Sequence, residues 1–100
     1  MSQDTEFIED RETFTEEPYV TPVGQWQILI ANVMADVLRI TRVGSNDNFT
    51  ELGGSSLDAV SICSRLKRDA NISLDAVVIV ESDTVADIAH HIHEVQRLER

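Results

Sequence analysis

The sequence predicts an all-α fold, a small bundle of three longer helices and one short helix. Apolar residues recur at helical spacing in several segments. Residues suited to helix caps precede two of these segments, and the one β-branched run has no second strand to pair with. The chain has 100 residues, of which 42% are hydrophobic and 5% aromatic. We therefore expect one domain with a modest, mostly aliphatic core.

The charge balance excludes several functions. Eighteen acidic residues stand against eight basic ones, for a formal net charge of −10, whereas binding to nucleic acid or to an anionic membrane needs a basic surface. No apolar run approaches the ~20 residues of a membrane span, and the N-terminus lacks the pattern of a secretory signal. The single cysteine, Cys63, excludes an internal disulfide and fits a reducing cytoplasm, where we expect the protein to act.

The two ends of the chain differ from its middle in composition. Residues 1–18 are rich in acidic residues, with Arg11 as their only base. Because their apolar residues show no sustained period, we expect this segment to be a disordered acidic tail. Residues 19–95 are expected to form the folded domain, and residues 96–100 a frayed C-terminus.

The first helix is predicted over residues 23–38. Trp26, Ile30, Val33 and Val37 step by four, three and four positions and so lie on one helical face. Further apolar residues outside this stripe widen the apolar face. A face of this width indicates either core packing or a contact surface for another protein.

A long loop is predicted over residues 39–55, beginning near Arg39. It is dense in Gly, Asn, Asp and Ser, and a loop of this length in so small a domain is usually functional. Phe49 and Leu52 are expected to insert into the core and anchor the loop.

The second helix is predicted over residues 55–70. Ser55 is suited to cap it, with Asp58 in the capping-box position. Asn71 is suited to end it in a left-handed conformation.

The remainder of the chain predicts one short and one longer helix. Residues 75–80, DAVVIV, are strand-like in composition, but because a lone strand has no partner we predict a short helical turn. Thr84 and Asp87 resemble a second capping box, and the last helix is expected to fray beyond Val95.

The stretch most informative about function is residues 53–57, GGSSL. Gly53 and Gly54 free the backbone to turn sharply and to approach a ligand closely. Ser55 uses its hydroxyl as a cap, whereas Ser56, at the first helical position, keeps a hydroxyl free to point outward. The positive end of the helix favours a phosphate ester there, although a plain Gly-Gly turn with serine caps explains the same residues.

These residues carry a resemblance to a known family. Residues 47–57, DNFTELGGSSL, resemble the modification motif of peptidyl carrier (thiolation) domains of nonribosomal peptide synthetases, members of the phosphopantetheine-binding acyl carrier superfamily. Residues 19–22, YVTP, resemble the linker before the family's first helix. Residues 82–89 resemble the start of its last helix, with Asp83 where the family commonly has proline. The resemblance covers roughly residues 19–93 and implies the four-helix fold of acyl carrier proteins.

The resemblance also implies the chemistry. Ser56 corresponds to the serine that receives 4′-phosphopantetheine from coenzyme A, and the thiol of that arm would hold an aminoacyl or peptidyl group as a thioester. The protein would then be no enzyme but the substrate of a phosphopantetheinyl transferase and of an adenylating enzyme. It would deliver its cargo to condensation or other tailoring enzymes of natural-product biosynthesis. Ser55 departs from the family, which often has His or Asp there, and this makes partner preference less certain.

Partner enzymes of this family dock on the second and the short helix. Leu57, Val60, Val77 and Val78 are the candidates here, and ordinary core packing is the alternative for each. The residues expected to support the attachment site share the loop and the helix start: Phe49, Leu52, Gly53, Gly54, Ser55 and Asp58.

No catalytic residue or metal site is predicted. His90, His91 and His93 lie on one helix without a third ligand on a shared face, which is typical of a solvated surface. Cys63 lies mid-helix among apolar residues, where an inert buried thiol is expected.

Two other functions agree with the sequence. One is an acyl carrier of polyketide or fatty-acid type, although the residues of the motif favour the peptidyl class. The other is a helical adaptor that binds proteins and is never modified. We further expect a monomeric, free-standing carrier, as the chain begins at a plausible start and contains no adenylation or condensation domain.

Overall fold

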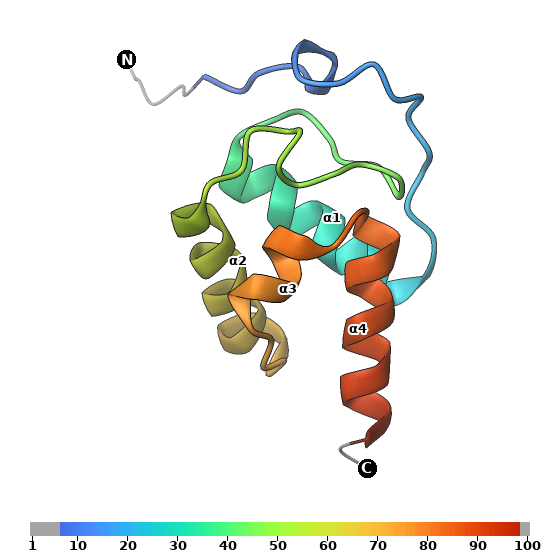
Figure 1. Ribbon diagram of the computed structural model, residues 1–100, viewed down its shortest axis with the longest axis vertical. Helices are drawn as coiled ribbons and strands as arrows, with labels where there is room; N and C mark the ends of the chain where they lie inside the picture. Colours follow the sequence, from blue (N-terminus) through green and yellow to red (C-terminus); the bar gives the residue numbers. More distant parts are fainter. Residues whose placement is uncertain (1–6, 99–100) are drawn as a thin grey trace.

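Four α-helices form the framework of the computed structural model, which describes residues 7–98 (Figure 1). They are α1 (Gly24–Leu38), α2 (Ser56–Ala70), α3 (Ala76–Glu81) and α4 (Val85–Leu98), and a 3-10 turn over Arg11–Thr13 precedes them. Helix α1 packs against both α2 and α4, and the short α3 bridges α2 and α4. The predicted all-α bundle of three longer helices and one short helix is confirmed.

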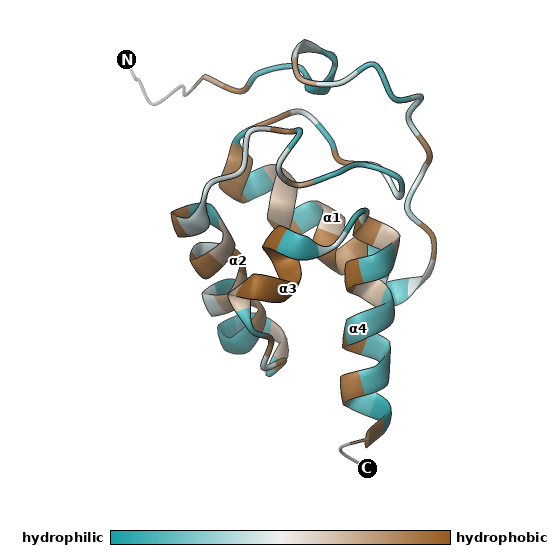
Figure 2. Ribbon diagram, in the orientation of Figure 1, coloured by the Kyte–Doolittle hydropathy of each residue, from teal (hydrophilic) through white to brown (hydrophobic). Residues whose placement is uncertain are grey.

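The core of the described residues is aliphatic apart from Phe49. Burying each large side chain contributes roughly 1.5–3 kcal/mol relative to leaving it exposed. The apolar faces of the helices turn toward one another, and polar residues occupy much of the outer face of α4 (Figure 2). The fully buried side chains include Ile30, Met34, Leu52, Ile62, Leu66, Ile72, Ile79, Val85, Ile88 and Ile92.

The core face of α1 differs from the predicted stripe. Ile30 and Val33 are buried, but Trp26 and Val37 are only partly buried and pack at the edge of the core. Met34, which the stripe omitted, is fully buried. The face is shifted because two helices, α2 and α4, pack on α1 and cover a broad sector of it.

The first two helices end at the residues where the sequence predicts that they end. Arg39 and Asn71 close α1 and α2 with positive φ angles of 60° and 55°. Residues 76–81 are helical, and the Asp75 side chain accepts a hydrogen bond from the Val77 amide at 3.1 Å. A lone β-branched run becomes a helical turn here because its Ile79 inserts into the core between α2 and α4.

The C-terminal helix is longer than predicted. Helix α4 continues to Leu98, three residues beyond the Val95 at which we expected its regular part to end, and residues 99–100 lie outside the described part. Arg97 forms an ion pair with Glu94 at 2.7 Å, one turn earlier. A basic residue in the last turn also complements the helix dipole. Within residues 7–98, none of the helices has the length and hydropathy that a bilayer crossing requires.

The expected disordered tail is wrong for residues 7–18. This segment runs over the loop between α1 and α2 (Figure 1), and Arg11 within it is only 1% exposed. Glu9 exchanges backbone hydrogen bonds with Arg39 and Thr41, at 2.9 and 3.0 Å. Backbone hydrogen bonds and polar side-chain contacts hold the segment against the loop, and such contacts do not require a periodic apolar pattern in the sequence. Residues 1–6 lie outside the described residues.

Deleting residues 1–17 is therefore expected to destabilise the fold. The deletion removes Arg11, the ion-pair partner of the buried carboxylate of Asp47. We expect a loss of about 3 kcal/mol, the lower end of the range for removing one partner of a buried pair, because water reaches Asp47 once the segment is gone. Urea unfolding measures it, and a chain lacking only residues 1–6 is the matched control. An unchanged unfolding midpoint would show that the segment does not dock.

Candidate functional site

Two neighbouring serines begin α2 and have different environments. Ser55 is the N-cap: its Oγ accepts a hydrogen bond from the Asp58 amide at 3.2 Å, and the Asp58 carboxylate accepts one from the Ser55 amide at 2.9 Å. Ser56 is the first helical residue, is exposed, and its hydroxyl bonds to no residue of the described chain. The predicted capping box is thus confirmed, and Ser56 presents the free hydroxyl.

The two glycines before these serines are required for separate reasons. Gly53 has φ +92°, a conformation that side chains disfavour. At Gly54 a Cβ would overlap the aromatic ring of Phe49. Gly54 is therefore needed because the space where its side chain would lie is filled by the protein's own core.

Two side chains of the loop that leads to Ser56 anchor it in the core. Phe49 and Leu52 are buried, as predicted. Asn48 accepts a hydrogen bond from the Glu51 amide at 2.8 Å and donates one to the Asp83 carbonyl at 2.9 Å, which joins the loop to the start of α4. These contacts fix the geometry of the turn that presents Ser56.

Asp47 and Arg11 are the site-supporting residues that sequence reasoning missed. Nε and Nη2 of Arg11 donate to the two carboxylate oxygens of Asp47, each at 2.6 Å, and Arg11 also donates to the Glu17 carbonyl at 2.7 Å. Hydrogen bonding to Asp47 raises the pKa of Arg11 despite its burial. No local pattern could reveal the pair, because the two residues lie far apart in the sequence.

The predicted partner surface is largely exposed. Leu57 is 78% exposed, Val60 51% and Val77 46%, whereas Val78 is half-buried. Core packing is thus excluded for the first three residues. Val80, on the exposed side of α3, is a further apolar member that sequence reasoning missed.

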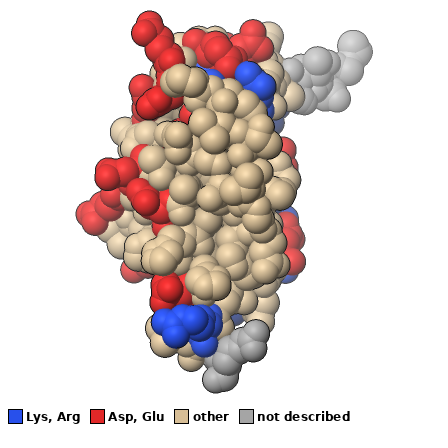
Figure 3. Space-filling view, turned by 90° about the vertical axis from the view of Figure 1, so that its right-hand side faces the viewer, with Lys and Arg blue, Asp and Glu red and all other residues tan. Residues whose placement is uncertain are grey.

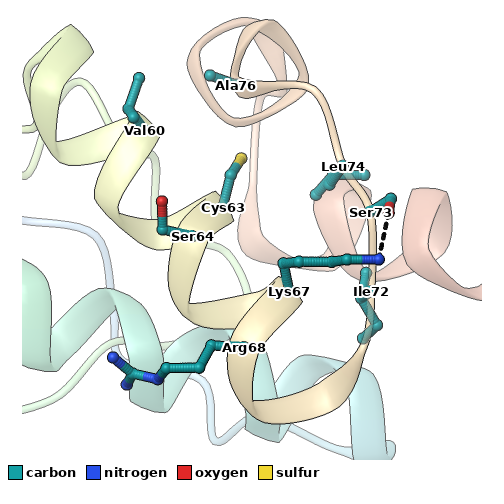
Figure 4. Close-up of a pocket in the computed structure, with 9 residues that line it drawn as sticks. All are labelled: Val60, Cys63, Ser64, Lys67, Arg68, Ile72, Ser73, Leu74 and Ala76. Atoms are coloured by element: carbon teal, nitrogen blue, oxygen red, sulfur yellow. Dashed lines mark hydrogen bonds between the residues drawn. The ribbon is translucent and has the colours of Figure 1, made fainter.

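An open pocket of about 540 Å³ lies between α2 and the segment that leads into α3 (Figure 4). Val60, Cys63 and Ala76 line its upper part, so the exposed apolar side chains of α2 continue into it. At its lower end the Lys67 ammonium donates to the Ser73 hydroxyl at 3.3 Å.

The remaining titratable candidates are Cys63 and the three histidines of α4. Burial, with a smaller effect of Asp75, raises the pKa of the half-buried Cys63 thiol, which disfavours the reactive thiolate. His90, His91 and His93 are exposed, and residues 7–98 contain no group of side chains suited to hold a metal ion. On the face drawn in Figure 3, Lys and Arg form only small groups near the ends, and this face has no broad basic surface.

Comparisons with known proteins agree with this geometry. The chain matches the family described as "Phosphopantetheine attachment site" over residues 29–92. "Tyrocidine synthase 3" of Brevibacillus parabrevis is 37% identical over 71 residues, which is 71% of this chain and 1% of that protein. "Gramicidin S synthase 2" of Brevibacillus brevis is 30% identical over 83 residues, which is 83% of this chain and 2% of that protein. The chain thus spans only a few hundredths of the length of these relatives.

Solved structures show the same fold. The complex titled "Solution structure of a non-covalent extended docking domain complex of the Pax NRPS: PaxA T1-CDD/PaxB NDD" matches with a TM-score of 0.75 and 26% identity, covering 85% of this chain and 82% of that one. A peptidyl carrier protein in complex with a phosphopantetheine transferase and coenzyme A matches with a TM-score of 0.70 and 25% identity, covering 76% and 99%.

The second helix of the four-helix bundle begins at an exposed serine, and the family match over residues 29–92 shows that the chain belongs to the phosphopantetheine attachment site family. Within that family it is a peptidyl carrier protein, as the sequence indicates. The family to which the chain belongs is one of carrier domains, and its cofactor is covalently attached 4′-phosphopantetheine.

The contact between Phe49 and Gly54 predicts a specific energetic coupling. Phe49→Ala should cost roughly 3–5 kcal/mol as a core truncation, and Gly54→Ala about 1–3 kcal/mol through overpacking. In the double variant the added methyl no longer meets a ring, so the summed cost should fall short of additivity. Urea unfolding checks this.

Gly24→Ala combined with Phe49→Ala is the matched control. Gly24, unlike Gly54, has a positive φ of 81°, and its Cβ would meet nothing within 4 Å, so these two costs should add. Additive costs for the Phe49 and Gly54 pair would contradict the contact.

Proposed function

We propose that Ser56 carries the 4′-phosphopantetheine arm through its Oγ. One observation carries this assignment: of the two serines at the start of α2, Ser55 is held in the capping box and Ser56 alone has an exposed hydroxyl with no hydrogen bond in the described chain. A transferase needs a hydroxyl that it can reach and deprotonate.

The start of α2 fits a phosphodiester. The first amides of a helix have no intrahelical acceptor, and the helix dipole makes that end positive. The Ser55 hydroxyl satisfies the Asp58 amide, whereas the amides of Ser56 and Leu57, the first two of α2, have no acceptor within the helix and are suited to a phosphate there. The Asp58 carboxylate is the nearby negative charge, and it is engaged with the Ser55 amide.

The carrier contributes by tethering rather than by catalysis. When attached, the arm supplies a terminal thiol that holds an aminoacyl or peptidyl group as a thioester. The chain's own residues hold the attachment point at a rigid helix end and leave the space around it open, so cargo reaches each partner site at high effective concentration.

The proposed partners are a phosphopantetheinyl transferase, an adenylating enzyme and condensation or tailoring enzymes of nonribosomal peptide biosynthesis. Support comes from the solved complex of a peptidyl carrier protein with a transferase, from the exposed Leu57 and Val60, which follow Ser56 on α2, and from the exposed Val77 on the neighbouring α3. Exposed apolar side chains grouped in this way favour protein contact. The unpaired, poorly reactive thiol of Cys63 supports a cytoplasmic location.

Ser56→Ala is expected to abolish arm attachment while the fold stays nearly unchanged, because the position is exposed and alanine is a good helix former. Intact mass after incubation with coenzyme A and a broad-specificity transferase measures the attachment. Ser55→Ala should remain modifiable and lose about 1 kcal/mol of stability through the missing cap.

Two results would contradict this assignment. Modification of the Ser56→Ala chain would place the arm elsewhere. An unmodified wild-type chain, under conditions that load a control carrier, would favour the adaptor function.

Leu57→Glu is expected to weaken transferase docking without unfolding the chain, because an acidic residue suits the first turn of a helix. We expect kcat/KM for arm transfer to fall about tenfold, which corresponds to about 1.4 kcal/mol and is typical of losing one interface anchor. Leu98→Glu is the control, because Leu98 is equally exposed but ends α4 at the opposite end of the bundle (Figure 1). Equal effects of both substitutions would rule out a local docking surface.

A further inference from the structure

The segment over residues 9–20 contacts the 39–55 loop along its whole length. At the start of the loop, the Arg11 amide donates to the Thr41 hydroxyl at 3.1 Å. At its middle, the Ser45 amide donates to the Val20 carbonyl at 2.8 Å. At its end, the Phe14 ring lies against Gly53, with 3.6 Å between its Cε1 and the place of a Cβ. The segment is therefore part of the structure that presents Ser56.

The central contact is the buried ion pair between Arg11 and Asp47. Both side chains are fully enclosed, at 1% and 0% exposure. The Asp47 carboxylate also accepts from the Gly44 amide at 2.8 Å, and the Asp47 carbonyl accepts from the Val85 amide at 3.0 Å. One residue thus joins the N-terminal segment, the loop and the start of α4.

We propose that Arg11 is a positioning residue for the transfer of 4′-phosphopantetheine to Ser56. It acts through Asp47, by holding the loop in the single conformation in which the Gly53–Gly54 turn presents the serine. The proposal rests on the proposed attachment at Ser56. Arg11 does not touch the reacting atoms.

The expected kinetic effect follows from the fraction of molecules in which the loop adopts the conformation that presents Ser56. If only a fraction of molecules holds the loop in the conformation that the transferase binds, the apparent dissociation constant rises by the inverse of that fraction. Molecules that do bind then react normally. Loosening the loop should therefore raise KM for the carrier and leave kcat unchanged.

Arg11→Lys and Asp47→Asn test the proposal, both in the full-length chain at a temperature where it stays folded. Lysine keeps the charge but cannot donate two parallel hydrogen bonds to one carboxylate. We expect roughly a tenfold rise in KM with unchanged kcat, and the double variant should be no worse than the poorer single variant. Amide hydrogen exchange should quicken over residues 44–55 while the amides of α1 keep their protection.

Arg42→Lys is the matched control. Arg42 packs on the same Tyr19 ring as Arg11 and pairs with the exposed Glu12, which also pairs with Arg11, but it forms no hydrogen bond or ion pair with Asp47. It should leave both KM and loop exchange unchanged.

The proposal is overturned if Arg11→Lys leaves KM unchanged, or if exchange quickens equally in the loop and in α1. The second outcome would show a contribution to global stability alone. The exchange measurement does not involve Ser56, so a failure of the attachment assignment would appear separately, as modification of the Ser56→Ala chain.

Discussion

The arrangement of the N-terminal segment, the 39–55 loop and the start of α4 depends on one interaction, the buried ion pair between Arg11 and Asp47. Removing two charges from water costs several kcal/mol per ion, and only good geometry with further hydrogen bonds offsets that cost. Here the guanidinium meets both carboxylate oxygens and also donates to the Glu17 carbonyl, and the carboxylate accepts in addition from the Gly44 amide. A pair so fully satisfied holds one arrangement of three segments and disfavours the alternatives.

The loop over residues 39–55 is an integral part of the fold, because it bonds to α4 and contributes to the core. Its carbonyls at Ser45 and Asp47 accept from the Ala86 and Val85 amides, which are the first amides of α4 and have no acceptor within their own helix. Its Phe49 supplies the aromatic member of the core. A chain of 100 residues has little core to spare, so the loop that presents Ser56 is also needed to complete the fold.

Two adjacent serines at the start of α2 have different environments. The Ser55 hydroxyl caps the helix, whereas the hydroxyl of Ser56 is exposed and takes no part in the cap. The same helix exposes Leu57 and Val60, side chains whose burial would have stabilised the isolated domain. Leaving them in water favours contact with another protein.

Much of this molecule was predictable because it depends on residues close together in the chain. Helical periodicity, the capping box of Ser55 with Asp58, and the left-handed stop at Asn71 are local, so the sequence alone determined the helices and the free hydroxyl of Ser56. The exposure of Leu57 could not be decided in that way, since apolar residues of α2 point both into the core and out of it.

Only the tertiary structure decided the role of the N-terminal segment. By composition, residues 7–18 are acidic and lack an apolar period, and such segments cannot order themselves by burying apolar surface. They are ordered instead by a guanidinium and a carboxylate that lie far apart in the chain. The need of each buried charge for the other is a long-range constraint, and no pattern of neighbouring residues encodes it.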